Sequence, residues 1–272
     1  MAAFDVAIRL GADVIEFDLR MSADGSLLAF HDSQLGRTTR PSRDRALVAE
    51  ATLEKVQGLS AGSWFNHRFP WHAREEYENE RVPTLEGILA RYSGPVGLLI
   101  DLKDPSTSPA MVPRLIQVLA EHGIGDATRS KHSLTVASFC SRSLLEIRSS
   151  TDRIRLMQLF DLTDPCGVAE LRRSAGYAEA VGLWRDNLDP SLVAGAHEAG
   201  LDFYAYTVNE FDDLSRAIHV GVDGIITNFP DRLAKVLHRV THKSGNALGY
   251  TSLGNKGLGT QTRSRAIRAI VG

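Results

Sequence analysis

Short apolar runs rich in Val, Ile, Leu and Phe alternate with segments of helical period along most of this chain. Each run is about four to eight residues long, which is typical of a buried strand. Strands that alternate with helices indicate βαβ units and a parallel sheet. We expect seven core strands, at about residues 13-19, 96-102, 132-138, 154-160, 180-184, 201-208 and 222-227.

The ends of the helical segments point to one particular parallel architecture. Asp189-Pro190 opens a helix that Gly200 closes, and the segment from Ala2 to Leu10 is interpreted as the end of an earlier helix. A β/α barrel has eight strands and roughly 250 residues. Two smaller domains would also fit the length of 272 residues. The alternation favours an α/β fold, a TIM (β/α)8-type barrel whose first strand is missing.

A long excursion, residues 26-94, separates the first two predicted core strands and far exceeds the usual two to six residues of a βα loop. Residues 27-30 are predicted to form a short extra strand, residues 52-59 a helical turn, and Pro83-Thr84 a helix start. Long ordered insertions are usually functional. The insertion, about 33-82, is therefore predicted to cap the barrel mouth.

The barrel domain is predicted to span residues 1-238. The remaining residues, 239-272, lack the apolar density to pack against a core and are predicted to form a disordered tail.

The charge balance excludes two classes of partner. With 31 basic and 33 acidic residues the net charge is -2, so no positive field would attract nucleic acid or an anionic membrane. No apolar run reaches the roughly 18 residues that span a bilayer.

Cys140 and Cys166 lack metal-site spacing and are expected to be reduced. A cytoplasmic location is predicted, with a signal peptide upstream of Met1 left open; the oligomeric state is not written in the sequence.

Acidic residues gather on one face of the first predicted strand. Glu16, Asp18 and Arg20 share this face because strand side chains alternate with period two. The opposite face is apolar, so the acids should point into the barrel near the end where barrel active sites lie. Carboxylates that converge there favour a hard cation such as Mg²⁺ or Ca²⁺. An internal salt bridge with Arg20 or Lys103 explains this pair equally well.

The next core strand repeats the pattern with Asp101 and Lys103 on one face. Asp101 would add a third carboxylate, and the ammonium of Lys103 suits a phosphate oxygen. His31-Asp32 follows the short extra strand, where an imidazole can act as general acid or base near the metal. Arg37-Thr38-Thr39 has the donors for a phosphate, although turn chemistry explains it nearly as well.

Together these stretches resemble the glycerophosphodiester phosphodiesterase family over roughly residues 2 to 234. The resemblance rests on motifs in a characteristic order: Glu16-Phe17-Asp18, Ser22-Ala23-Asp24-Gly25, Phe30-His31-Asp32, Arg37-Thr38-Thr39, Ala61-Gly62-Ser63-Trp64-Phe65, Val82-Pro83-Thr84-Leu85-Glu86, Tyr206-Thr207-Val208-Asn209 and Gly221-Val222-Asp223-Gly224-Ile225-Ile226-Thr227-Asn228-Phe229-Pro230-Asp231.

The resemblance implies a hydrolase of lipid and glycerol metabolism that cleaves small glycerophosphodiesters to glycerol 3-phosphate and an alcohol. One Mg²⁺ or Ca²⁺ would be bound by Glu16, Asp18 and Asp101. His31 would be one of two catalytic histidines, and Lys103 and Tyr206 would bind the substrate. The family usually has Glu in place of Asp101 and Trp in place of Tyr206.

A His-Arg pair, which ends the first strand in the family, would lie before Met1. Loss of a positioned acid or base costs ~10² to 10⁴ in rate, so the chain as written is expected to be nearly inactive. The favoured interpretation is a working enzyme whose first strand lies before Met1. Two alternatives stay open. One is an inactive protein that binds phosphodiesters; the other is a related phospholipase D-like enzyme that acts on lysophospholipid or sphingomyelin.

Overall fold

The computed structural model describes residues 1–41, 43, 45–124, 134–163, 166–243 and 268–271, and the chain forms two compact units. The first unit comprises Met1–Val6 and Phe17–Arg155, and the second comprises Ala7–Glu16 and Leu156–Gly272. The boundary between them falls inside strand β1 (Val14–Met21). One continuous strand therefore contributes to both units.

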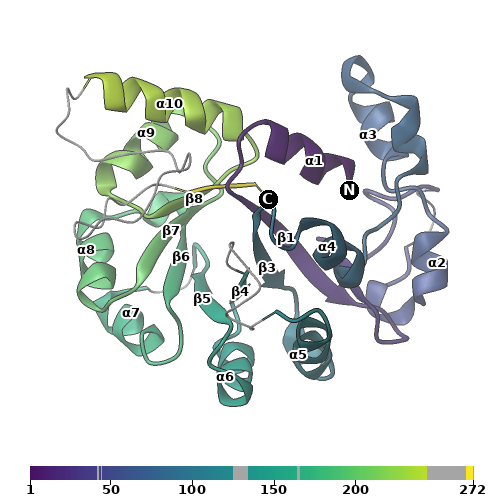
Figure 1. Ribbon diagram of the computed structural model, residues 1–272, viewed down its shortest axis with the longest axis horizontal. Coiled ribbons are helices and arrows are strands. Elements are labelled where there is room, and N and C mark those ends of the chain that lie inside the picture. The colour runs from purple at the N-terminus through teal and green to yellow at the C-terminus, as the bar shows by residue number, and fades with distance from the viewer. Residues whose placement is uncertain (42, 44, 125–133, 164–165, 244–267, 272) are drawn as a thin grey trace. The chain divides into compact units, whose positions relative to one another are not determined.

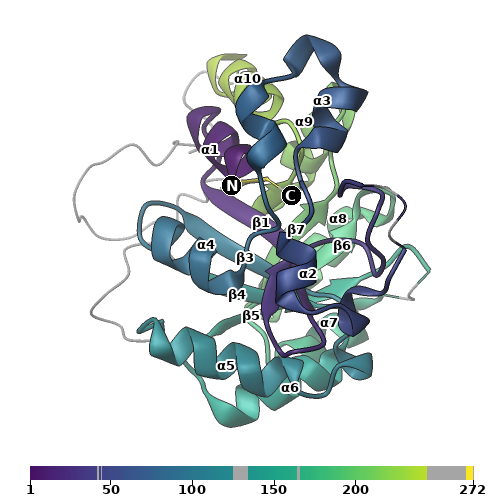
Figure 2. The same ribbon diagram turned by 90° about the vertical axis from the view of Figure 1, so that its right-hand side faces the viewer.

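The strands of the first unit run in the order β2-β1-β3-β4. β2 (Leu27–Ala29) is antiparallel to β1, whereas β3 (Gly97–Leu102) and β4 (Leu134–Ser138) are parallel. Every residue of β3 is buried, as expected for a strand covered on both faces. The helices α5 (Met111–Glu121) and α6 (Ser141–Ser150) lie side by side (Figure 2).

The insertion after β1 folds around a small core of its own, which includes β2. Its helical turns are η1 (Val48–Glu50), α2 (Leu53–Gln57), α3 (Ser63–Arg68), η2 (Pro70–His72) and η3 (Glu75–Asn79). The buried apolar side chains come from both ends of the insertion: Leu28, Phe30, Leu35, Val48, Ala51, Val56, Leu59 and Val82. A cap over a barrel mouth stays a prediction for this segment.

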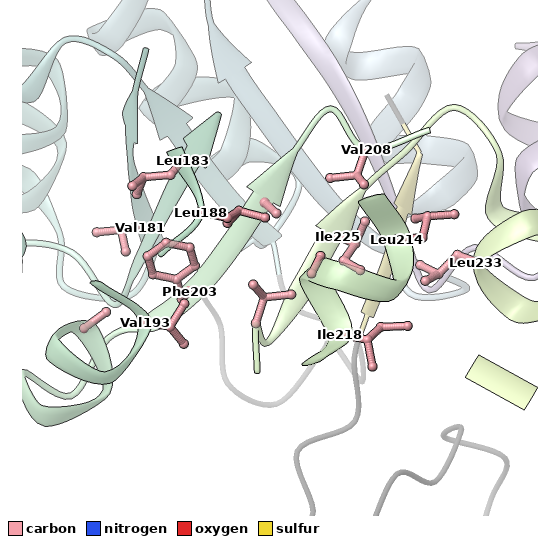
Figure 3. Packing of buried hydrophobic residues seen from close by; sticks show 14 of the residues in the cluster. Val181, Leu183, Leu188, Val193, Phe203, Val208, Leu214, Ile218, Ile225 and Leu233 are labelled. Atoms are coloured by element: carbon pink, nitrogen blue, oxygen red, sulfur yellow. The ribbon is translucent and has the colours of Figure 1, made fainter. Parts of the chain in front are cut away.

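The second unit contains a parallel run of strands: β5 (Arg155–Phe160), β6 (Ala180–Trp184), β7 (Asp202–Tyr206) and β8 (Gly224–Ile226). The helices α7 (Val168–Ser174), α8 (Pro190–Glu198) and α9 (Phe211–Val220) lie along one side of these strands (Figure 1). Between them lies an apolar core in which Phe203 is fully buried among Val181, Leu183, Val193 and their neighbours (Figure 3).

Elements predicted from the sequence match those of the structure closely. All seven core strands are found, with residues 132-133 of the third outside the described residues. The short extra strand is β2, and the helix predicted to start at Pro83-Thr84 is α4 (Leu85–Tyr92), capped by the Thr84 hydroxyl, which accepts from the Gly87 amide. The first helix is α1 (Ala2–Arg9).

The C-terminal region differs from the predicted tail at both of its described ends. The helix α10 (Pro230–Lys243) continues past residue 238, and Arg268–Val271 forms a further strand, β9. This strand is parallel to β8, with Ile270 opposite Ile226, and parallel to β1, with Ile270 opposite Val14. The sequence pattern did not predict β9, because only a few apolar residues follow a long polar stretch. Residues 244–267 lie outside the described part.

Among the described residues, the helices are either too short or too polar to pass through a lipid bilayer.

Candidate active site

The acidic face predicted for the first strand is present in β1. Ile15, Phe17 and Leu19 are buried, whereas Glu16 and Asp18, which alternate with them, are only half-buried. Glu16, Asp18 and Asp101 each offer one carboxylate oxygen, and these oxygens lie within 4.8 Å of one another. The three acids predicted to hold a cation therefore converge.

Backbone pairing explains why Asp101 and Lys103 reach the same place as Asp18. The Lys103 amide, just after β3, donates to the Leu19 carbonyl in β1 at 3.0 Å. The Lys103 ammonium then donates to Asp18 Oδ1 at 2.8 Å and to Asp101 Oδ2 at 2.5 Å. Of the two partners considered for an internal salt bridge, Lys103 is the one that binds Asp18.

Arg20, the other candidate partner, turns to different groups. Its Nη1 lies 2.8 Å from Asp104 Oδ2, and its Nε donates to the His31 carbonyl at 2.9 Å. Arg20 thus binds Asp104 and the backbone beside the site, whereas Lys103 binds Asp18 and Asp101.

Burial and charge act in opposite directions on Asp101 and Lys103 at the end of β3. It raises the pKa of the Asp101 carboxyl because the charged form is poorly solvated there, while the nearby Lys103 ammonium acts in the opposite direction. Burial alone would lower the pKa of Lys103, but the charges of Asp101 and Asp18 outweigh it, so the pKa of Lys103 is raised. Lys103 therefore remains a cation.

One carboxylate oxygen of this acidic group lacks a hydrogen-bond partner among the described residues. This oxygen, Asp101 Oδ1, is buried. A buried carboxylate oxygen without a partner is costly, and a hard cation would satisfy it. Carboxylates are also the ligands that Mg²⁺ and Ca²⁺ prefer. The donor set therefore fits a divalent cation.

His31 is held beside the acidic strand through its backbone. The Phe30 amide donates to the Asp18 carbonyl at 2.9 Å, and Arg20 donates to the His31 carbonyl. The imidazole itself is 67% exposed, so it is accessible to a small molecule in solution. Its Nδ1 lies 2.9 Å from Asp32 Oδ1.

The structure assigns Arg37 a partner that the sequence did not reveal. Arg37 donates from Nε to Asp32 Oδ2 at 2.6 Å and from Nη2 to Asp32 Oδ1 at 2.8 Å. Of the two interpretations of Arg37, phosphate donor and turn residue, the observed contacts favour the local one. These contacts lower the pKa of Asp32 to about 2.

Phe139 is a further residue near the site that sequence reasoning missed. It directly follows β4, is 40% exposed, and its ring centroid lies 5.7 Å from Lys103 Nζ. Its position at the end of a predicted core strand was the signal that could have revealed it, because barrel sites gather at that end.

Tyr206 belongs to the second unit and is largely buried there. Its hydroxyl, at the end of β7, donates to the Phe160 carbonyl at the end of β5 at 2.6 Å. The Trp184 ring meets the Tyr206 ring edge-on with 5.9 Å between centroids. Contact between Tyr206 and a substrate stays a prediction.

Comparison with known proteins gives consistent matches along the chain. The family described as glycerophosphoryl diester phosphodiesterase matches residues 1–232. A glycerophosphodiester phosphodiesterase of Bacillus subtilis (strain 168) is 33% identical over 236 residues, which are 86% of this chain and 80% of that protein.

Solved structures extend the likeness to three dimensions. A protein from Silicibacter pomeroyi DSS-3, provisionally named a glycerophosphoryl diester phosphodiesterase, matches with a TM-score of 0.74 and 26% identity over 88% of this chain and 87% of that one. An Oleispira antarctica phosphodiesterase in complex with the product sn-glycerol-3-phosphate matches with a TM-score of 0.73 and 22% identity over 87% and 90%. These matches confirm the α/β fold of TIM-barrel type; the missing first strand stays a prediction.

Proposed function

Because the chain belongs to the glycerophosphoryl diester phosphodiesterase family, we propose that it hydrolyses glycerophosphodiesters to glycerol 3-phosphate and an alcohol. The observation that carries this proposal is the group of three carboxylate oxygens within 4.8 Å of one another, with Lys103 bound to two of the acids. Three acids beside one permanent cation suit an anionic substrate and a metal ion together. A small glycerophosphodiester is the proposed partner, and a cytoplasmic location, which the composition favours, belongs to the same proposal.

Glu16, Asp18 and Asp101 are the proposed ligands of one Mg²⁺ or Ca²⁺. When bound, the ion supplies Lewis-acid polarisation of a phosphoryl oxygen and offsets its negative charge. Asp101 Oδ1, buried and without a hydrogen-bond partner among the described residues, supports its role as a ligand. Asp has a shorter arm than the Glu usual in the family, so Asp101 depends on close approach of β3 to β1.

The other proposed residues handle the substrate and its protons. Lys103 binds a phosphate oxygen, and Tyr206 lines the glycerol end. In the reaction, the oxygen of water forms a bond to phosphorus, the bond from phosphorus to the alcohol oxygen breaks, and the departing alkoxide takes up a proton. His31 transfers a proton either from the attacking oxygen or to the leaving oxygen.

Release of glycerol 3-phosphate from glycerophosphocholine and glycerophosphoethanolamine tests this proposal. Whatever its rate, release of the product by the purified chain should require Mg²⁺ or Ca²⁺ and should stop when EDTA is added. Asp101→Asn removes one charge at the buried ligand and should lower kcat by ~10² or more, as loss of one preorganised electrostatic group does. Asp231→Asn, at an exposed Lys235 pair on α10, is the matched control and should leave kcat unchanged.

Three results would contradict the proposed activity. The first is release of glycerol 3-phosphate that continues in EDTA or that is unchanged in Asp101→Asn. The second is faster cleavage of lysophosphatidylcholine or sphingomyelin than of either glycerophosphodiester, which would favour the phospholipase alternative. Metal-dependent binding of glycerophosphocholine without cleavage would favour the inactive binding protein instead.

A further inference from the structure

Asp32 contacts two basic side chains, His31 and Arg37, in the segment after β2. Its Oδ1 lies 2.9 Å from His31 Nδ1, and both of its oxygens accept hydrogen bonds from the Arg37 guanidinium. The planar fork of Arg37 matches a carboxylate in two parallel bonds, which fixes the orientation of Asp32 as well as its charge.

The charge of Asp32 decides what it can do for His31. Its hydrogen bond with Arg37, together with the smaller effect of His31, holds the pKa of Asp32 at about 2. Asp32 is therefore ionised at neutral pH, and an ionised carboxylate can only accept hydrogen bonds. The nitrogen that faces it must carry the hydrogen.

We infer that Asp32, clamped by Arg37, is a positioning residue that holds His31 in the tautomer with hydrogen on Nδ1 and presents the Nε2 lone pair outward. This inference rests on the proposed function, because it concerns the histidine that transfers a proton there. In a neutral imidazole only the nitrogen without hydrogen can accept a proton. The Asp32–Arg37 clamp thus selects Nε2 as the atom of His31 that meets the substrate.

The remaining contacts of His31 show why such a clamp is needed. Its backbone is tied to β1 through Arg20 and through the neighbouring Phe30 amide. The imidazole is 67% exposed, so packing does little to fix its ring. Asp32 provides the described hydrogen bond to the imidazole, and its own side chain is only 20% exposed. Orientation of the ring therefore depends on Asp32.

A purely local role for the Arg37–Asp32 pair leads to a different expectation. If the pair only stabilised the turn from His31 to Arg37, its removal would lower the free energy of unfolding without changing which imidazole nitrogen carries hydrogen. A measurement of the tautomer separates the two roles.

Long-range ¹H–¹⁵N NMR of the protein labelled in histidine reads the tautomer directly, with His31→Gln to assign the signals. We expect hydrogen on Nδ1 in the wild type. Asp32→Asn keeps the shape but loses the charge, and it should yield a mixture of tautomers. Arg37→Gln should shift the population in the same direction, whereas Arg37→Lys should retain more of the Nδ1–H form. Arg173→Gln, which removes an exposed guanidinium from Glu170 on α7, should change nothing.

Hydrogen on Nε2 in the wild type, or a tautomer unchanged in both Asp32→Asn and Arg37→Gln, would overturn the inference. Because Arg37→Gln leaves Asp32 in place, it remains informative if Asp32→Asn does not fold.

Hydrolysis of glycerophosphocholine provides the second readout. Asp32→Asn should lower kcat by at least about tenfold with little change in KM, a smaller loss than the ~10⁴ known for a buried His–Asp pair. Absence of hydrolysis in the wild type would contradict the proposed function, while the NMR result would still decide on the clamp. A wild-type rate in Asp32→Asn would overturn the inference even if the proposed function holds.

Discussion

Lys103 occupies a position at which its charge has opposite effects on two ligands. Its ammonium binds oxygens of Asp18 and Asp101, which are also the proposed ligands of the cation. A positive charge so close repels a divalent ion, but it attracts a phosphate. At the scale of single residues, the site balances these two effects.

Replacement of Lys103 separates the two effects. Lys103→Met keeps much of the side-chain length but removes the charge, so we expect tighter binding of Mg²⁺ or Ca²⁺ and a KM for glycerophosphocholine raised about tenfold or more. Calorimetric titration with each ion and steady-state kinetics check these expectations. Lys235→Met, on an exposed helix pair, is the control. Weaker ion binding in Lys103→Met would contradict this account, because it would mean that Lys103 supports the acids more than it repels the ion.

How much of the site the sequence predicts depends on whether its residues lie in regular strands or in an irregular loop. Glu16, Asp18, Asp101 and Lys103 could be predicted because strand periodicity fixes the face of each side chain, and adjacent parallel strands end together. The hydrogen bond from Arg37 to Asp32 could not be predicted, because it depends on the path of an irregular loop. No periodic pattern encodes such a path.

At the scale of secondary structure, β9 is the instructive case. Six of the seven core strands were predictable because each is an apolar run followed by a helical segment, and the first, β1, because its apolar and charged residues alternate. Arg268–Val271 has neither a long apolar run nor a following helix. The two strands that it pairs with, β8 and β1, are distant from it in sequence. Pairing over such a separation is decided by which strand edges remain available, and local propensity says little about it.

A proline in β9 tests whether this pairing contributes to stability. Ile270 lies opposite Ile226 on one side and Val14 on the other, so a residue without a backbone N–H at this position must disturb a ladder. We expect Ile270→Pro to lower the free energy of unfolding by roughly 1 to 3 kcal/mol. Chemical denaturation followed by circular dichroism measures this change. Ile270→Val keeps the N–H and should stay near the wild type; equal stability of both variants would show that β9 contributes nothing.

At the scale of the whole molecule, stability in the second unit depends on the apolar core around Phe203. This ring is fully buried between β7 and the helices that flank it (Figure 3). The composition and the strand pattern already indicated a large core, but which side chain lies at its centre depends on packing between distant segments.

Truncation of this ring should have a large effect on unfolding. Phe203→Ala removes a buried aromatic side chain and leaves a cavity, so we expect a loss of about 3 to 5 kcal/mol in the free energy of unfolding. Leu162→Ala, at a position that is 52% exposed, is the control and should change it by less than about 0.5 kcal/mol. Urea unfolding monitored by tryptophan fluorescence provides the measurement. A similar small change in both variants would show that Phe203 is not central to this core.

The division of β1 between two units has a consequence for co-translational folding. Ala7–Glu16 is synthesised early, but the rest of its unit begins only at Leu156. While the intervening residues emerge, the first unit can assemble from Phe17 onward, and Val14 and Ile15 must wait for β9 before their strand edge is paired. Glu16 directly follows Val14 and Ile15 in β1. The N-terminal half of β1 is therefore among the last parts of the nascent chain to complete its strand pairing.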